Sequence, residues 1–143
     1  MTIDSARAGD IPAVRRLLEA QHLPLDGVDA LTDTMVVASS GQEIIGAAAV
    51  ELYAGGALLR SVVVSPRMQG QGLGHRLTEA ALELAKSRGV TTVFLLTTSA
   101  EKFFPRLGFE QISRTDVPES VQASVEFQSA CPASATVMRK RLV

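Results

Sequence analysis

Apolar residues recur with two different periods along the chain, and these periods predict its helices and strands. Helical spacing after Asp10, and again from Leu73 to Ala85, predicts two amphipathic helices, the first ending by Pro24 and the second at Gly89. β-prone apolar runs predict strands at residues 2–7, 35–38, 43–53, 57–64, 90–96, 109–114 and 135–142, with 43–53 and 57–64 forming a hairpin. Short helices are expected at residues 99–108 and 118–127. The order β-α-β-β-β-α-β-α-β-α-β predicts an α/β fold with a mixed sheet.

Composition and charge predict a single soluble domain that spans residues 1–143. The net charge of −1 argues against a general nucleic-acid-binding protein, which normally carries a basic excess. The start MTIDSARAGD lacks a signal-peptide pattern, and no apolar run approaches the ~20 residues of a membrane helix, so we expect a cytoplasmic protein without a membrane partner. Cys131 is the only cysteine, which excludes an intramolecular disulfide and a thiolate metal cluster; no metal site is predicted.

Three glycines within five positions, Gly70, Gly72 and Gly74, stand between the strand 57–64 and the long helix that follows. Glycine costs conformational entropy, so bare backbone is needed there for a tight turn or for a phosphate. The lysine of a Walker loop is missing, and so are the spacing and the distal acid of a dinucleotide fingerprint. Backbone N–H groups can still converge at the positive end of the helix. The loop therefore predicts a pyrophosphate site, with a purely structural turn as the alternative.

The stretches VVVSPRMQGQGLGHRL and AEKFFPRLGFE resemble the two signature motifs of the Gcn5-related N-acetyltransferase (GNAT) superfamily, and the resemblance extends over essentially the whole chain. It implies a mixed, mostly antiparallel sheet flanked by helices, whose splayed central strands hold acetyl-CoA as co-substrate. It also implies that loop amides cradle the pyrophosphate and that the strand edge pairs with the pantetheine arm. The cofactor-binding residues implied in this way are Val62, Val63, Val64, Gln69, Gly70, Gln71, Gly72, Leu73, Gly74, His75, Thr97, Phe103 and Phe104.

The same resemblance implies that an amine attacks the thioester directly, and that a backbone N–H near Val63 or Val64 polarises the thioester carbonyl; Val64 is the catalytic candidate. The sequence departs from the family at Phe104, where the proton-donating tyrosine is expected, and at Thr97, where an asparagine is expected. A thiolate leaves readily, so the missing acid need not abolish turnover. Glu51 is the predicted base, with a solvent-facing strand glutamate as the alternative interpretation, and Glu126 is the second candidate.

On the acceptor side the candidates are Tyr53, Arg60, Glu126 and Cys131, although a lone cysteine is more often a small buried residue. The tail DVPESVQASVEFQSACPASATVMRKRL resembles small acetyltransferases encoded with arsenic-resistance genes. This implies a small, amino-acid-like amine as acceptor, such as a toxic glutamate analogue or an organoarsenical. The sequence thus predicts an acetyl-CoA-dependent N-acetyltransferase. The alternatives are a CoA-binding sensor or partner module without catalysis, and an enzyme that acetylates protein N-termini or lysines. Relatives are often dimers, so a homodimer is also implied.

Overall fold

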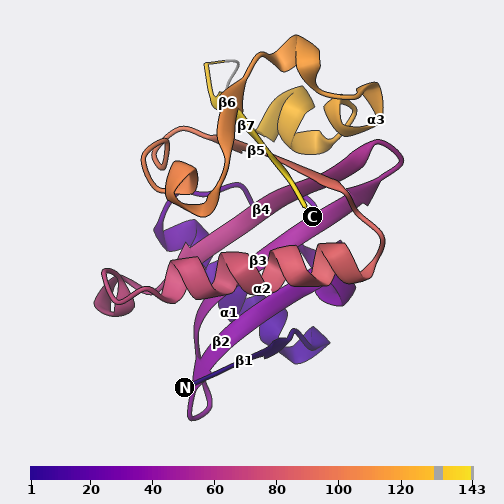
Figure 1. Cartoon of the computed structure of the whole chain (residues 1–143). Helices are drawn as coiled ribbons and strands as arrows, with labels where there is room; N and C mark the ends of the chain where they lie inside the picture. Colours follow the sequence, from indigo (N-terminus) through magenta and orange to yellow (C-terminus); the bar gives the residue numbers. More distant parts are fainter. Residues whose placement is uncertain (131–133, 143) are drawn as a thin grey trace.

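In the part of the chain that the structure describes, seven strands form one sheet in the order β1-β2-β3-β4-β5-β7-β6. The structure is a computed structural model and describes residues 1–130 and 134–142. The strands β4 and β5 are parallel and the other neighbouring pairs are antiparallel, so the predicted mixed, mostly antiparallel sheet is confirmed (Figure 1). The strands are β1 (Thr2–Ser5), β2 (Met35–Ser40), β3 (Glu43–Tyr53), β4 (Gly56–Val64), β5 (Thr92–Thr97), β6 (Glu110–Ile112) and β7 (Thr136–Arg141).

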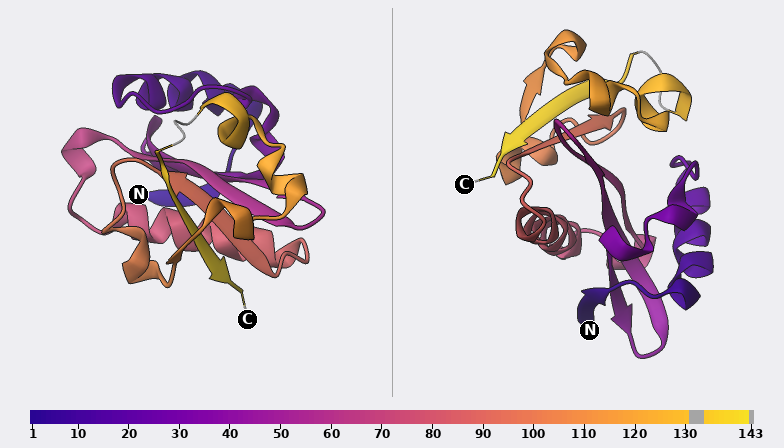
Figure 2. Two further views of the ribbon diagram at one scale, coloured as in Figure 1. Left: turned by 90° about the horizontal axis from the view of Figure 1, so that it is seen from above. Right: turned by 90° about the vertical axis from the view of Figure 1, so that its right-hand side faces the viewer.

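Two long helices cover opposite faces of the strands β1 to β4, as both views of Figure 2 show. The helix α1 (Ile11–Ala20) buries Val14 and Leu18 against one face, and α2 (Leu73–Ser87) buries its apolar stripe, which includes Leu77, against the other. A Cβ atom on Gly46 of β3 would lie 2.7 Å from Leu77 Cδ1, so only glycine lets α2 pack this closely on the strand. Both helices are those predicted from the period of 3.6 residues.

The strands β4 and β5 pair at only two positions, Ala57 with Val93 and Leu58 with Phe94. Beyond these positions β4 pairs only with β3, while β5 continues along β7 as far as Thr97. The register between β3 and β4 shifts at Ala47/Ala49, and the facing residue Ser61 has a φ of +57°. Such a bulge bends its strand, which separates β4 from β5 and leaves two facing edges of unpaired backbone. The predicted splayed central strands are therefore present.

The segment between β6 and β7 differs from the prediction of a single helix over residues 118–127. It forms α3 (Glu119–Gln122) and, after an interruption, a π-helical turn over Glu126–Ala130. Ser124 lies at the interruption, and its Oγ accepts a hydrogen bond from the Phe127 N–H at 3.4 Å, an alternative to the regular helical bond. Val117 and Val121 pack on Leu58, Phe94 and Val137, so this segment covers the sheet over β4, β5 and β7.

The helix predicted at residues 99–108 is also shorter than expected. It is reduced to a 3-10 turn over Phe104–Leu107, because Pro105 has no N–H to donate and its ring obstructs a regular helix. Strand ends differ from the predicted ones by a few residues. Further 3-10 turns occupy Ala8–Asp10, Val28–Ala30, Thr32–Thr34, Pro66–Met68 and Arg114–Asp116. Within the described residues, none of the helices combines the length and the apolar character that crossing a membrane requires.

Candidate active site

The glycine loop between β4 and α2 has the backbone geometry of an anion-binding turn. Gly70 and Gly72 adopt left-handed φ angles of +80° and +82°, and no atom lies within 4 Å of a Cβ placed on either residue. The left-handed conformation, rather than crowding, therefore requires glycine, and the space above the loop is open. The helix α2 begins directly after Gly72, and no side chain of the described residues caps it. Its first-turn N–H groups remain available to a phosphate.

The free edge of β4 presents alternate amides to the gap beside β5. The Ser65 N–H donates to the Ile45 carbonyl of β3 at 2.8 Å. Because N–H directions alternate along a strand, the Val63 amide also faces β3, whereas the amides of Val62 and Val64 face the gap. Val63 in addition buries its side chain against α1. Of the two oxyanion donors considered in the sequence, the geometry thus favours Val64, and Val63 offers nothing to the gap.

Two glutamine side chains hold the end of β4 in place. The Val64 carbonyl accepts hydrogen bonds from Gln21 Nε2 at 2.6 Å and from Gln69 Nε2 at 3.0 Å, and Gln69 Nε2 also lies 3.2 Å from Gln21 Oε1. Gln69 therefore ties the loop to the strand through its side chain. Gln21 was not predicted from the sequence, because no sequence pattern relates a residue just after α1 to the end of β4, which is distant along the chain.

The remaining loop residues differ in what they offer a cofactor. Leu73, the first residue of α2, is only 3% exposed and packs its side chain in the core, so it contributes at most its backbone. Gln71 is exposed. His75 Nε2 lies 3.0 Å from Glu79 Oε1 on the exposed face of α2. A Cβ on Gly74 would lie 3.4 Å from the Phe103 ring, so Phe103 borders the loop directly.

Thr97 and Phe104 have structural contacts at the end of β5. The Thr97 hydroxyl accepts hydrogen bonds from the Ala100 N–H at 2.9 Å and from the Ser99 N–H at 3.4 Å, which closes the turn after the strand. Phe104 is 7% exposed and packs edge-on against Phe103 and Phe109, with ring centroids 5.0 and 5.7 Å away. Its ring cannot donate a proton, so the described contacts give this position a packing role.

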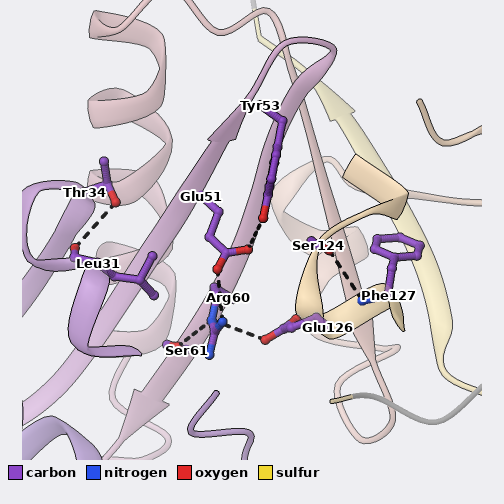
Figure 3. A network of polar contacts seen from close by, with 9 residues as sticks. All are labelled: Leu31, Thr34, Glu51, Tyr53, Arg60, Ser61, Ser124, Glu126 and Phe127. Carbon is purple, nitrogen blue, oxygen red and sulfur yellow. Dashed lines mark hydrogen bonds and ion pairs between the residues drawn. The ribbon is translucent and has the colours of Figure 1, made fainter. Parts of the chain in front are cut away.

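The acceptor-side candidates converge around the guanidinium of Arg60 (Figure 3). Arg60 Nη1 lies 3.1 Å from Glu51 Oε2, and Arg60 Nε lies 3.3 Å from Glu126 Oε2. The Tyr53 hydroxyl donates to Glu51 Oε1 at 2.7 Å. Glu51 and Tyr53 come from β3, Arg60 from β4 and Glu126 from the π-helical turn. The structure thus brings these four predicted residues together in one network; Cys131 lies outside the described residues.

The network is largely buried, and this affects the protonation of Tyr53. The Arg60 side chain is fully buried, while those of Glu51 and Glu126 are 14% and 6% exposed. Burial, together with the hydrogen bond to Glu51 and the charge of that carboxylate, raises the pKa of Tyr53 well above its ordinary value. The tyrosine is therefore a neutral hydrogen-bond donor throughout the physiological range. Glu51 is not the solvent-facing glutamate of the alternative interpretation.

Ser61 and Gly27 also lie against this network, and neither had a signal in the sequence. The Ser61 hydroxyl accepts a hydrogen bond from Arg60 Nε at 3.1 Å. Gly27, which follows α1 in the chain, lies against the network: a Cβ on it would be 3.6 Å from Arg60 Nη1 and 3.8 Å from Glu51 Oε2. The network around Arg60 is thus built from the loop after α1, the β3–β4 hairpin and the segment before β7.

Comparisons with known proteins agree with this geometry. The model of the acetyltransferase (GNAT) domain matches residues 32–111. An amino-acid acetyltransferase of Mycobacterium tuberculosis is 30% identical over 126 residues, which cover 81% of this chain and 72% of that protein. This sequence match reaches well beyond the two signature motifs.

Two solved structures share the fold. The N-acetylglutamate synthase of Neisseria gonorrhoeae, complexed with coenzyme A and N-acetyl-glutamate, superposes with a TM-score of 0.86 at 24% identity, over 99% of this chain and 35% of that chain. This chain thus spans about a third of the length of the Neisseria protein. Rv2747 of Mycobacterium tuberculosis, in a complex that contains CoA, superposes with a TM-score of 0.84 at 24% identity over 100% of both chains. The family match and the related sequence, on top of the splayed sheet and the glycine loop, show that the chain belongs to the GNAT acetyltransferases: it is an N-acetyltransferase with acetyl-CoA as its co-substrate.

Proposed function

We propose that this N-acetyltransferase acetylates the primary amine of a small amino acid, with glutamate-like molecules as the acceptor class. The observation that carries the proposal is the buried pair of Glu51 and Arg60, 3.1 Å apart. A carboxylate beside a guanidinium complements the ammonium and the carboxylate of an amino acid. The similarity to the amino-acid acetyltransferase of Mycobacterium tuberculosis points to the same class.

The fit of acetyl-CoA to the chain rests on the open space over Gly70 and Gly72 and on the unpaired edge of β4. Acetyl-CoA supplies an acetyl group that is already activated as a thioester. The loop amides and the start of α2 would hold its pyrophosphate, and the Val62 and Val64 amides would face its pantetheine arm. The Val64 N–H would donate a hydrogen bond to the thioester carbonyl oxygen and stabilise the negative charge that develops there.

Proton transfer is assigned to Glu51. An amino-acid ammonium must lose one proton before it can attack, and the Glu51 carboxylate accepts this proton. The neutral amine then forms a bond to the carbonyl carbon, the carbon–sulfur bond breaks, and the second amine proton neutralises the departing thiolate directly or through water. A thiol with a pKa of ~8.5 leaves without a dedicated acid, which is compatible with Phe104 at the position of the usual tyrosine.

The proposed acceptor class includes toxic glutamate analogues and organoarsenical amino acids without favouring them. They share the α-amino-acid head group on which the Glu51–Arg60 pair would act. The relative from Mycobacterium tuberculosis described above is an amino-acid acetyltransferase, and it adds no support for an arsenic-containing acceptor. Acetylation of protein N-termini is a competing outcome that the assay below distinguishes.

A thiol-release assay tests the proposed function. The protein is incubated with acetyl-CoA and, separately, with free L-amino acids, simple alkylamines and short peptides. We expect free thiol and N-acetyl product with amino acids of the glutamate type, and much less with alkylamines or peptides. In Glu51→Gln we expect kcat to fall on the order of 100-fold, because general-base catalysis contributes about that much, while calorimetric affinity for acetyl-CoA stays unchanged. Release with peptides alone, or equal kcat in Glu51→Gln, would contradict the proposal.

A further inference from the structure

The Arg60 guanidinium is buried with one of its nitrogens unused. Nη1 contacts Glu51 and Nε contacts Glu126 and Ser61, but Nη2 has no hydrogen-bond partner among the described residues. The side chain has no exposed surface, so Nη2 is also shielded from bulk solvent. Buried N–H groups of a charged side chain are rarely left without acceptors in folded proteins. This unpartnered nitrogen indicates that a ligand completes the site.

The arrangement of the nitrogens indicates which ligand fits. In a guanidinium, the Nε–H and one Nη2–H lie parallel along one edge, and a carboxylate binds this edge with two hydrogen bonds. Glu126 Oε2 lies 3.3 Å from Nε on this edge, whereas Nη2 has no partner among the described residues. We propose that the Nε/Nη2 edge of Arg60 binds the α-carboxylate of the acceptor amino acid, and that Glu126 is an internal occupant which the acceptor displaces. The inference rests on the proposed function and names the group that recognises its substrate.

The neighbouring Glu51 favours the α-carboxylate over a side-chain carboxylate. Glu51 Oε2 lies 3.1 Å from Arg60 Nη1, so groups bound to the two side chains are close neighbours. In an α-amino acid only three covalent bonds separate the amine nitrogen from a carboxylate oxygen. An α-carboxylate on Arg60 therefore places its own amine beside Glu51, the proposed base. A side-chain carboxylate on Arg60 would hold the amine at a greater distance.

The position of Glu126 allows the exchange. Glu126 starts the π-helical turn Glu126–Ala130 and belongs to none of the strands, and turns of this type are frequent at functional sites. Gly27 closes the Nη1 side of the guanidinium, whereas Glu126 covers the Nε side. Withdrawal of Glu126 would uncover the proposed carboxylate edge. Because one carboxylate replaces another, the buried guanidinium keeps its charge compensation throughout the exchange.

Calorimetry on the complex with CoA tests this inference with L-glutamate, L-isoglutamine and L-glutamine as probes. L-Isoglutamine lacks only the α-carboxylate and L-glutamine lacks only the side-chain carboxylate, so the two amides are matched controls. We expect L-isoglutamine to bind at least tenfold more weakly than L-glutamate, and L-glutamine to bind within about threefold of it. In Arg60→Lys, which retains the charge but loses the two-nitrogen edge, L-glutamate should lose at least tenfold in affinity and the preference over L-isoglutamine should disappear.

The variant Glu126→Gln tests the proposed displacement of Glu126, because it retains the shape of the side chain but removes the competing charge. L-Glutamate should bind this variant as tightly as the wild type or more tightly; tenfold weaker binding would overturn the displacement. Wild-type affinities that are equal for L-glutamate and L-isoglutamine, or no L-glutamate binding at all, would overturn the carboxylate site. The comparison of L-glutamate with L-isoglutamine in the wild type tests the carboxylate site even if Arg60→Lys does not fold. Equal acetylation of all three probes would overturn this inference alone, whereas the absence of any acetylated amino acid would overturn the proposed function.

Discussion

The β3–β4 hairpin and the tail bring three side chains, Glu51, Tyr53 and Glu126, into one network with the buried guanidinium of Arg60, and their individual chemistry can be measured. Arg60 binds Glu51 on one side and Glu126 on the other, and Glu51 in turn accepts a hydrogen bond from the Tyr53 hydroxyl. Removing one partner from such a buried pair typically costs about 3–5 kcal/mol of stability, because it leaves an uncompensated charge. Isosteric changes such as Glu51→Gln are therefore more informative than truncations to alanine.

Tyr53 reports directly on this network, because it is the only tyrosine and the chain has no tryptophan. In an alkaline titration at 295 nm, we expect the folded protein to ionise at a pH above the ~10 of a free tyrosine, since burial and Glu51 raise the Tyr53 pKa. Glu51→Gln should shift the midpoint back towards ~10, and the denatured chain should titrate there as well. A folded midpoint at the ordinary value would contradict the hydrogen bond between Tyr53 and Glu51.

The raised pKa also sets the pH range in which Tyr53 affects stability. Below the ordinary tyrosine pKa both the folded and the unfolded chain hold the phenolic proton, so this group adds no pH dependence. Above it the unfolded chain releases the proton first, and the free energy of unfolding falls as the pH rises. Urea unfolding at several pH values on either side of that limit measures this change.

Phe104→Tyr tests whether this position faces the departing thiolate. We expect the variant to retain its affinity for acetyl-CoA, and kcat to stay level or rise, because the hydroxyl supplies the missing proton donor. The matched control is Phe109→Tyr, since Phe109 belongs to the same ring cluster and is 3% exposed. In that variant we expect only a loss of stability of about 1–3 kcal/mol from a buried hydroxyl without a partner. Loss of both binding and turnover in Phe104→Tyr would show that position 104 is sealed from the site.

At the scale of elements, the junction between β4 and α2 is the part of the fold that we expect to bind phosphate. Two glycines with nearly the same conformation allow a matched experiment: Gly72 with a φ of +82° before α2, and Gly89 with a φ of +83° after it. Neither has an atom within 4 Å of an added Cβ. Replacement by alanine should therefore strain the backbone equally in both, by about 1–2 kcal/mol.

Gly72→Ala should in addition weaken acetyl-CoA binding at least tenfold, about 1.4 kcal/mol, because the new Cβ occupies the space above the loop and the strain redirects its amides. Gly89→Ala should bind acetyl-CoA like the wild type. Calorimetry measures the acetyl-CoA affinity of both variants, and urea unfolding measures their free energy of unfolding. Equal acetyl-CoA affinity in Gly72→Ala and Gly89→Ala would contradict the assignment of this loop.

The elements that could be predicted from the sequence are those whose apolar residues recur with a clear period. The stripe of α2 and the β3–β4 hairpin appear with nearly the expected residues, since apolar spacing and a Gly-containing turn determine them. The segment after Pro118 was predicted wrongly because Ser124 competes with the helical backbone in a way that periodicity does not register. The separation of β4 from β5 was predicted from family resemblance alone, since no hydrophobic pattern in the sequence indicates the bulge at Ser61.

The candidate site was predictable in its residue types but not in its contacts. Glu51, Tyr53, Arg60 and Glu126 were all named from the sequence. The first three meet within the β3–β4 hairpin, whereas Glu126 joins them only because the tail folds over the sheet. Gln21 and Gly27 were missed, because their partners Val64 and Arg60 lie far along the chain and only the tertiary structure relates them. Long-range pairs of this kind have no local sequence signal.

At the scale of the whole molecule, we expect the split sheet to separate two binding functions. One wall of the gap is the free edge of β4, which ends at the glycine loop, and the other is β5 with its partner β7. The acceptor network lies on the sheet face opposite α2, between the loop after α1 and the segment before β7. We therefore expect co-substrate and acceptor to enter from different sides. The single-domain organisation, the cytoplasmic location and a homodimer stay predictions.

The central claim is that this chain transfers acetyl from acetyl-CoA to the α-amine of a free amino acid. The most direct measurement uses acetyl-CoA labelled with carbon-13 in the acetyl group, L-glutamate as acceptor, and mass spectrometry with NMR of the product. We predict N-acetyl-glutamate that carries the label on its nitrogen, formed in equal amount to the free CoA thiol and strongly reduced in Glu51→Gln. Tight binding of acetyl-CoA without any labelled N-acetyl amino acid, from L-glutamate or from the other amino acids, would contradict the claim.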